Sequence, residues 1–446
     1  MTDEERAETS VRAVFTLAWP VMISMLSYTG MSVIDTLFVA RLGTDPLAAV
    51  GLAAVLVFFT QSFGAGLMGG VRVLVSQATG AGNPSTAARL GWQGIWIALP
   101  LGALMSLMSL LPPELFHLLG ATPTVADHAD AFFSIRVLGA PLVLLNIGIS
   151  AWFQGRGDTV TPMRATLIGN GLNLVFDPLL IFGLWGFPEL GVAGAALATI
   201  TAGLFQVAYL TWRASPDLLK VSRSPDKRLI RSVLDMGIPI GVRYTLDMGS
   251  FVIFSAMITH VGPVQLAAHI IVVRICSMSF LPGHAVGEAA GVLVGQFVGA
   301  GRKHLAKPVV ISSVKLAVGI MASWGVIFLT LPELLVSPFE TEAAVAQIAA
   351  SVLIVAAAFQ IFDAIVMAVG GGLNGAGDTR WVMIASLIGA WLIKVPGAYI
   401  GIFIFDLGAR GAWLAFTVEL VLLSVAYTHR ARGQAWLKGA ASAATG

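Results

Sequence analysis

The sequence predicts an all-α, polytopic membrane protein whose transmembrane helices form two six-helix lobes related by internal duplication. Three observations lead to this fold class. Hydrophobic residues make up 57% of the chain and charged residues only 11%, with a mean hydropathy of +0.86, whereas soluble globular domains are about 25% charged. The apolar residues form long runs between polar or Gly- and Pro-rich breaks. Corresponding motifs recur at a fixed spacing along the chain, as Pro20 and Pro239 do.

Taking the breaks in chain order gives twelve expected transmembrane helices. They lie near residues 13–40, 46–77, 85–112, 124–153, 160–184, 190–212, 230–259, 264–297, 305–331, 343–372, 380–405 and 409–429. Each run is long enough to cross a hydrocarbon core of about 30 Å. The polar start of the chain, Met1 to Arg12, leads into the first span without the pattern of a cleavable signal.

The loops between these spans alternate in charge. One set is rich in arginine and lysine, most densely from Arg213 to Arg231, whereas the other carries acids such as Glu114, Glu189 and Glu333. The positive-inside rule makes the basic loops cytoplasmic, and with an even number of spans both termini are cytoplasmic too. We therefore expect an integral, multi-pass protein of the plasma (inner) membrane in contact with the lipid bilayer. The net charge of only +2 gives no support for nucleic-acid binding.

The repeated motifs define the two lobes. Four pairs share one spacing along the chain, and they are Pro20 and Pro239, Gly43 and Gly262, Gln77 and Gln296, and Pro113 and Pro332. An even number of spans in each half places the repeat axis along the membrane normal. We predict an N-lobe over residues 1–215, a cytoplasmic linker over 216–229 and a C-lobe over 230–446. Duplicated lobes suit alternating access, and two complete lobes in one chain predict a monomer.

Polar residues inside the spans predict a cation site in the N-lobe. An ionisable side chain there costs about 2.5–3.5 kcal/mol on insertion scales, so we expect Asp35 to face protein or water. Asn173 and Asp177 are four residues apart and share a helix face, while Pro178 removes a backbone donor beside the carboxylate. Counted from the external ends, Thr199 lies at a similar depth. Such oxygens suit Na⁺, and two nearby carboxylates equally suit a proton.

Two structural interpretations of the same residues remain open. Asp35 would then cap a helix end at the membrane interface, and Asn173 with Asp177 would form only an interhelical hydrogen-bond clasp. No prosthetic cofactor is expected in either case.

Taken together, these motifs resemble the multidrug and toxic compound extrusion (MATE) family, in particular its NorM- and DinF-like bacterial antiporters. The resemblance covers about residues 12–430 and rests on the order and spacing of several motifs. They are Pro20…Asp35-Thr36…Gly43, Asn173-Leu-Val-Phe-Asp177-Pro178, Gly191-Val-Ala-Gly-Ala-Ala-Leu-Ala-Thr199 and the Gly-x-Gly-Asp-Thr loops at 155–159 and 375–379.

The resemblance implies a secondary active transporter, in which Na⁺ or H⁺ drives the export of small amphipathic, often cationic compounds. It assigns Asp35, Asn173, Asp177 and Thr199 to the N-lobe cation site, and Na⁺ at the first three is one of the two open alternatives, with H⁺ the other. We further expect cation binding to bend the first span near the hinge residue Pro20 and so to shrink the outward-facing cavity.

The C-lobe carries acids of its own. The resemblance places Asp247 and Asp363 where NorM-like members have acidic cation-site residues, with Asp247 standing where a glutamate is usual. Arg243 lies one turn from Asp247, and Arg274 and Lys394 lie inside the eighth and eleventh spans. These acids therefore either bind a second cation or are neutralised in salt bridges.

Two further acids, Glu288 and Glu419, are expected to be interfacial or packing residues outside the site.

Three other functions compete with antiport. A lipid-linked saccharide flippase of the same superfamily would share the spans, but should carry more basic residues in its cavity. A major facilitator transporter should have a basic loop after the second span, where this chain has Ala81-Gly-Asn-Pro-Ser85. An intramembrane enzyme could in principle use Asp35 and Asp177 as an aspartyl dyad. The duplicated transport architecture and the lack of a protease motif lead us to expect a transporter and not an enzyme.

Overall fold

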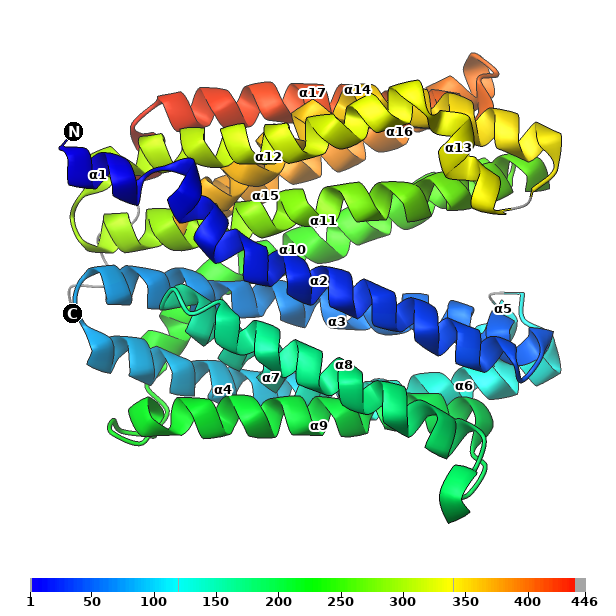
Figure 1. The fold of residues 1–446 in the computed structure, drawn as a ribbon, viewed down its shortest axis with the longest axis horizontal. Coiled ribbons are helices and arrows are strands. Elements are labelled where there is room, and N and C mark those ends of the chain that lie inside the picture. The colour runs from blue at the N-terminus through cyan, green and yellow to red at the C-terminus, as the bar shows by residue number, and fades with distance from the viewer. Residues whose placement is uncertain (1, 119, 340, 438–446) are drawn as a thin grey trace. The chain divides into compact units, whose positions relative to one another are not determined.

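The computed structural model describes residues 2–118, 120–339 and 341–437 (Figure 1). All regular structure among these residues is helical, as the composition predicts. Contacts divide the chain into two compact units. The N-unit comprises residues 23–75 and 83–241, and the C-unit comprises residues 1–22, 76–82 and 242–446. The end of the predicted C-lobe, residues 438–446, lies outside the described residues.

The N-unit is a bundle in which α8 lies along α9 and α4 lies along α7. Its helices are the later part of α2 (Val11–Ala40), most of α3 (Thr44–Gly80), α4 (Pro84–Ser106), α5 (Glu114–Leu118), α6 (Pro123–Leu138), α7 (Ala140–Gly155), α8 (Val160–Ile181), α9 (Gly191–Leu218) and the start of α10 (Lys227–Thr259). The 3₁₀ turns η1 (Leu107–Leu110) and η2 (Leu184–Gly186) complete it. One of its hydrophobic clusters contains Phe116, whose ring meets the edge of Phe133 at 5.9 Å.

The C-unit is organised around α14, which contacts α11, α12 and α17. Its elements are α1 (Asp3–Glu8), the start of α2, the end of α3, the rest of α10, α11 (Pro263–Gly299), η3 (Lys303–Leu305), α12 (Ala306–Thr330), α13 (Pro332–Val336), η4 (Ser337–Phe339), α14 (Ala343–Gly375), α15 (Thr379–Ile388), η5 (Gly389–Lys394), α16 (Val395–Tyr399), η6 (Ile400–Ile404), α17 (Gly408–Arg432) and η7 (Ala435–Leu437). Two of these elements, η5 and η6, are π-helical segments within one helical stretch over residues 379–404.

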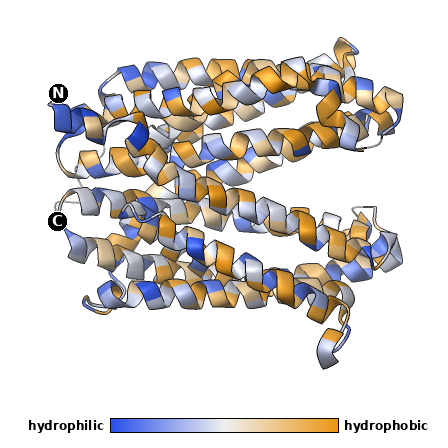
Figure 2. Ribbon diagram, viewed as in Figure 1, coloured by the Kyte–Doolittle hydropathy of each residue, from blue (hydrophilic) through white to orange (hydrophobic). Residues whose placement is uncertain are grey.

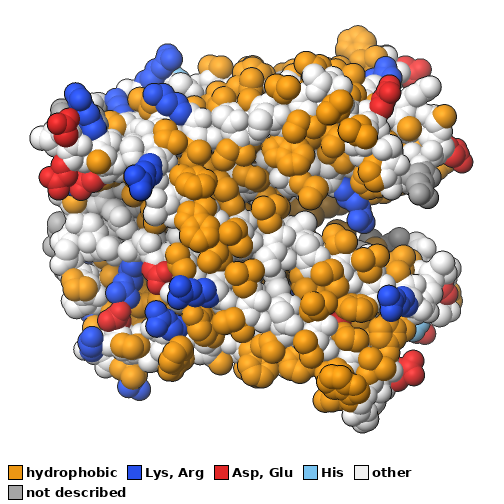
Figure 3. Space-filling model, viewed as in Figure 1, with side chains coloured by type: hydrophobic (Ala, Val, Ile, Leu, Met, Phe, Trp, Pro, Cys, Tyr) orange, Lys and Arg blue, Asp and Glu red, His pale blue; other side chains and the backbone are white. Residues whose placement is uncertain are grey.

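The lengths and compositions of the helices confirm a multi-pass membrane protein. Nine helices among the described residues are long and apolar enough to cross a membrane, and the pair α6 and α7, bent by 46°, would add a tenth. Hydrophobic residues run along much of the helices in Figure 2, and in Figure 3 they cover the middle of the visible face while charged side chains gather toward helix ends. The two long helices α8 and α10 carry Asp177 and Asp247 and are not among these ten. Twelve crossings therefore remain a prediction that requires α8 and α10 to span as well.

The backbone repeats as the sequence does. Gly43 and Gly262, one of the repeated pairs, have φ of 121° and 137°, and Gly157 and Gly377 of the two Gly-x-Gly-Asp-Thr loops have φ of 88° and 90°. A side chain rarely adopts such a positive φ, which explains why glycine occurs at both copies. The duplicated motifs therefore encode the same turns.

Three changes of unit fall inside helices instead of in the linker. One lies between Val75 and Ser76 in α3. The other two lie between Met22 and Ile23 in α2 and between Gly241 and Val242 in α10. Each of these two lies a few residues after the proline that interrupts that helix, Pro20 in α2 and Pro239 in α10. The units therefore divide the chain differently from the predicted lobes 1–215 and 230–446. Breaks in the sequence mark loops, whereas the packing partners of a helix can change partway along it.

Close helix packing anchors the two exchanged segments. At the start of α2, Val14 and Ala18 belong to a C-unit core that includes Ala289 of α11. At the start of α10, a Cβ added to Gly66 of α3 would lie 2.7 Å from the Cα of Gly241. The small residues thus let helix backbones meet directly.

The predicted linker is an ordered part of the N-unit. Helix α9 ends at Leu218, whose carbonyl accepts a hydrogen bond of 2.9 Å from the indole of Trp92. The indole of Trp96 donates to the Arg223 carbonyl at 2.7 Å, and Arg89 forms an ion pair with Asp226. The segment is therefore held along α4.

The two described chain ends meet at one place in the C-unit. Arg302 forms an ion pair of 2.6 Å with Glu8 of α1, and Lys303 donates to the Leu437 carbonyl at 2.9 Å. The hydrogen bond that Arg302 donates to Glu8 raises the pKa of Arg302. Both ends therefore lie at the same end of the C-unit, as an even number of spans predicts.

The contact between α11 and α14 generates a stability prediction. A Cβ on Gly371 would overlap the carbonyl oxygen of Gly287, so Gly371→Ala must push the two helices apart. Overpacking of this kind costs about 1–3 kcal/mol, and we expect a lower midpoint of thermal unfolding in detergent. Gly319→Ala in α12 is the control, because no atom lies within 4 Å of its added Cβ. Equal midpoints for the two variants would contradict the close approach.

Candidate cation site

Two carboxyl groups meet inside the N-unit. Asp35 lies on α2 and Asp177 on α8, and their carboxyl groups are within hydrogen-bonding reach of each other. The Asp177 side chain is completely buried, whereas Asp35 is half-buried. The structure thus brings together two acids that are far apart in the sequence.

Asn173 supports one side of this pair. Its Nδ2 donates a hydrogen bond of 3.1 Å to Oδ1 of Asp177, one turn away on the same face of α8. Pro178 follows directly inside the helix and lacks the N–H that would continue the backbone ladder. This hydrogen bond lies within α8, and Asp177 in turn faces Asp35 of α2.

The carboxyl pair is incompletely satisfied. Asp35 Oδ1 and Asp177 Oδ2 are buried and accept no hydrogen bond from the described residues. Neighbouring carboxylates repel strongly in a medium of low dielectric, so both cannot stay charged without a compensating positive charge. A monovalent cation bound to these oxygens, or a proton shared between them, would provide that compensation.

Arg136 of α6 lies within electrostatic range of Asp35. Its half-buried guanidinium is a fixed positive charge near the pair. The sequence analysis missed this residue, although a lone arginine inside the predicted span 124–153 was a usable signal.

Thr199 remains a predicted member of the site. Its hydroxyl donates a hydrogen bond of 3.0 Å to the Ala195 carbonyl within α9. Back-bonding of this kind is the usual arrangement for a threonine inside a helix. The described hydrogen bonds thus join Asn173 to Asp177, whereas the hydrogen bond of the Thr199 hydroxyl stays within α9.

Further amides connect the helices of the N-unit. Asn170, one turn before Asn173 on α8, donates to the hydroxyl of Ser27 on α2 at 2.8 Å. Asn146 of α7 donates to Oε1 of Gln206 on α9 at 2.6 Å. Sequence reasoning missed these residues, although amides inside apolar spans were the available signal.

The C-unit acids have cations beside them. Asp247 and Arg243 share one face of α10, and Asp247 lies within electrostatic range of both Arg243 and Lys394. Asp363 on α14 is buried, and Glu419 lies within its electrostatic range. This arrangement is closer to the salt-bridge interpretation than to an isolated pair of acids.

The structure decides the exposure of Arg274 and corrects the expectation for Glu419. Arg274 is exposed on α11, because its position on the helix turns it away from the buried face that carries Ile275 and Cys276. Glu419 is a buried partner of Lys394, not a packing residue outside the cluster, and the two charged atoms are 3.5 Å apart. Helix rotation, which the sequence spacing left open, decides both outcomes.

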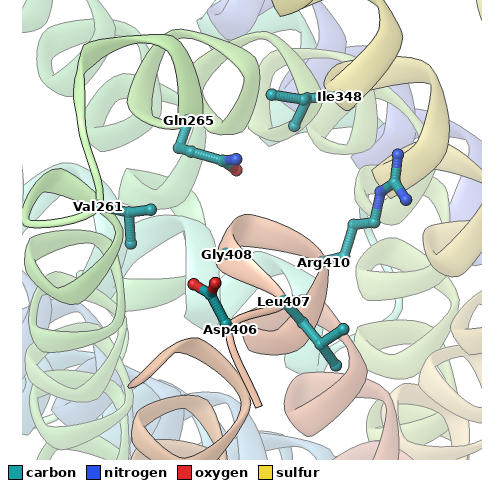
Figure 4. Close-up of a pocket in the computed structure, with 7 residues that line it drawn as sticks. All are labelled: Val261, Gln265, Ile348, Asp406, Leu407, Gly408 and Arg410. Atoms are coloured by element: carbon teal, nitrogen blue, oxygen red, sulfur yellow. The ribbon is translucent and has the colours of Figure 1, made fainter. Parts of the chain in front are cut away.

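A separate pocket of about 270 Å³ lies in the C-unit (Figure 4). Its lining includes Val261, Gln265, Asp406 and Arg410, and none of the predicted site residues. Gln265 accepts a hydrogen bond of 3.0 Å from the backbone N–H of Ala409 and so fixes the start of α17. The pocket is therefore distinct from both groups of buried acids.

Comparison with known proteins identifies the family. A family model described as MatE matches residues 20–179 and again residues 239–400. The two matches begin at Pro20 and Pro239, which are the first pair of repeated motifs. A probable multidrug resistance protein NorM of Pseudomonas putida is 30% identical over 434 residues, which cover 94% of each chain. The multidrug resistance protein NorM of Burkholderia vietnamiensis is 30% identical over 92% of this chain and 91% of its own.

Solved structures share the fold. A multidrug resistance MATE family transporter of the MOP superfamily in an outward-facing conformation has a TM-score of 0.89 at 21% identity, covering 98% of this chain and 99% of its own. A MOP superfamily transporter from Pyrococcus furiosus has a TM-score of 0.87 at 23% identity, covering 97% and 98%. Together with the two sequence matches, these findings confirm the resemblance. The chain belongs to the MatE family and is an integral membrane transporter.

Proposed function

We propose that this protein is a cation-coupled antiporter that exports small amphipathic, often cationic compounds by alternating access. The observation that carries the proposal is the buried, adjacent pair of carboxyl groups on Asp35 and Asp177. Relatives that are 30% identical over more than nine-tenths of the chain are named multidrug resistance proteins, which supports the substrate class. The chain acts on its substrates as a monomer in this proposal.

The proposed topology has twelve transmembrane helices in the inner membrane, with both termini in the cytoplasm. The potential across this membrane is negative inside. The support for this topology is the alternation of basic and acidic loops and the meeting of both described chain ends on the loop after α11. Helices α8 and α10 cross the membrane although they carry buried charges, because those charges face protein.

The coupling cation is Na⁺ or H⁺, and it neutralises the carboxyl pair. Carboxylate oxygens of Asp35 and Asp177, with the amide oxygen of Asn173, are hard ligands suited to Na⁺. Two adjacent carboxyl groups equally suit a shared proton. The inside-negative potential adds about 2.3 kcal/mol per charge per 100 mV to inward cation movement.

Helix α2 links cation binding to movement. Its start is held by the C-unit and its Asp35-bearing part by the N-unit, and Pro20 lies just before the change. A proline inside a helix removes a backbone hydrogen bond and permits a bend. We propose that neutralising Asp35 changes the bend at Pro20 and closes the outward-facing state, which releases the drug.

The first prediction concerns Asp35→Asn, which removes one carboxylate while keeping the size of the side chain. We expect efflux of a fluorescent lipophilic cation from proteoliposomes to fall to the rate of protein-free vesicles, because the coupling cation loses its charge partner. Wild type is measured under a Na⁺ gradient and, separately, a proton gradient, and the effective gradient names the coupling ion. Asp45→Asn is the matched control, because Asp45 is exposed in the first turn of α3.

Full efflux by Asp35→Asn would refute the site. Movement driven by neither gradient in wild type would favour the flippase, with lipid-linked saccharides tested next.

The second prediction concerns the support of Asp177. Asn173→Ala removes the donor to Asp177 Oδ1, and a lost hydrogen bond to a buried charged group costs about 1–3 kcal/mol. We expect the concentration of coupling cation needed for half-maximal transport to change at least about fivefold, because about 1 kcal/mol corresponds to that factor. Asn170→Ala is the control, because its partner is a serine hydroxyl. If both variants shift the cation dependence equally, Asn173 has no special role.

The third prediction concerns the hinge. Pro20→Ala restores a backbone donor inside α2, where proline is less favourable than alanine by about 3 kcal/mol. We expect a straighter, more stable α2 and a lower maximal transport rate, measured in the same vesicles with cation affinity nearly unchanged. Pro100→Ala is the control, since Pro100 also interrupts a helix, α4, that lies wholly within the N-unit. A similar loss of rate in both variants would assign the effect to helix stiffness in general.

A further inference from the structure

The C-unit buries an ion pair that neither the family match nor the names of the relatives explain. Lys394 Nζ lies 3.5 Å from Oε2 of Glu419, and the two side chains are only 7% and 5% exposed. The ammonium also lies 5.3 Å from the centre of the Phe416 ring on the same helix as Glu419. Desolvating both charges costs more than an apolar pair of the same size would. An ion pair buried between two membrane-spanning segments is therefore a candidate for function.

The local backbone is shaped around this pair. Lys394 is the last residue of the π-helical segment η5, and Glu419 lies in the middle of α17. A Cβ added to Gly389, at the start of η5, would lie 3.3 Å from Cγ of Glu419, so the two helices approach closely here. π-helical turns inside α-helices are frequently found at functional sites. The π-segment and Gly389 together hold Lys394 against α17.

Lys394 also faces acids beyond its direct partner. Asp247 lies within electrostatic range of Lys394, of Arg243 and of Glu419, and Asp363 lies within range of Glu419. The cluster thus holds three carboxylates against two basic side chains. If all five groups are charged, a single negative charge remains inside the C-unit. One added monovalent cation would neutralise it.

We propose that Lys394 is a built-in cation that sets how many coupling cations the C-unit takes up in each transport cycle. The inference rests on the proposed cation-coupled function and adds a specificity-determining residue to it. Glu419 and Lys394 neutralise each other, so that only one charge in the Asp247 and Asp363 group is left for the coupling cation. Without Lys394 the same carboxylates require one more cation before the buried cluster is neutral.

The test measures the coupling ratio, the number of cations exchanged per drug molecule. Proteoliposomes containing the full chain are clamped at a series of membrane potentials, and the cation gradient that stops movement of a lipophilic cation gives the ratio. We expect Lys394→Gln to raise the ratio by about one cation, because one fixed positive charge is lost. We expect Glu419→Gln to lower it by about one, because Lys394 is then free to neutralise Asp247.

The double variant Lys394→Gln with Glu419→Gln keeps the net charge of the cluster, so its coupling ratio should return to that of wild type. Lys315→Gln is the matched control, since it removes an exposed lysine on α12 and should not change the ratio. If Lys394→Gln does not fold, Glu419→Gln and the double variant still give different expectations, a lowered ratio for the first and the wild-type ratio for the second.

Two outcomes separate the inference from the proposed function. A wild type that couples cation to drug, with the same ratio in Lys394→Gln and Glu419→Gln, would overturn the role of Lys394 alone. A double variant that keeps an altered ratio would do the same, because the net charge would then not be the determinant. A wild type without cation-driven drug movement would overturn the proposed function and the inference with it.

Discussion

The repulsion between two neighbouring carboxyl groups inside the N-unit is the constraint on which the candidate site depends. Asp35 and Asp177 come from α2 and α8, and each has one oxygen without a donor among the described residues. Fully satisfied polar networks stabilise a fold, whereas an unsatisfied pair of acids does not. The amide of Asn173 donates to only one of these four carboxyl oxygens, Oδ1 of Asp177. Arg136 supplies a fixed positive charge near the pair, and in the proposed function the coupling cation supplies a mobile one.

The second half repeats the turns of the first but not its pair of acids. By the spacing that relates Pro20 to Pro239, the position corresponding to Asp35 is Phe254, which is buried with its ring 6.3 Å from that of Trp413. Aromatic packing replaces a carboxyl there, and buried acids appear instead at Asp363 and Glu419, close to the cation of Lys394. Each half therefore buries negative charge, but the C-unit carries a larger share of the compensating positive charge within itself.

Two helices connect the units in the same way. Helices α2 and α10 each begin in one unit and continue in the other, and in both a proline lies just before the change. The starting segments are anchored by small residues such as Ala18, at points where apolar surface and backbone meet without long side chains between them. Because Asp35 lies on the continuing part of α2, a change in its charge acts on a helix whose start is fixed elsewhere.

Composition, hydrophobic run length and repeat spacing determined by themselves that this chain is a duplicated, all-helical membrane protein, and the motif order indicated its family. They also selected Asp35, Asn173 and Asp177, because an ionisable group in an apolar span is informative on its own. Only the tertiary structure decided that the acids are adjacent, that Thr199 bonds to its own helix, and that Glu419 pairs with Lys394 while Arg274 is exposed. The physical reason is that the partner of a buried side chain depends on the depth and rotation of two separate helices. Spacing along one chain fixes which residues share a face of one helix, but not which helix that face meets.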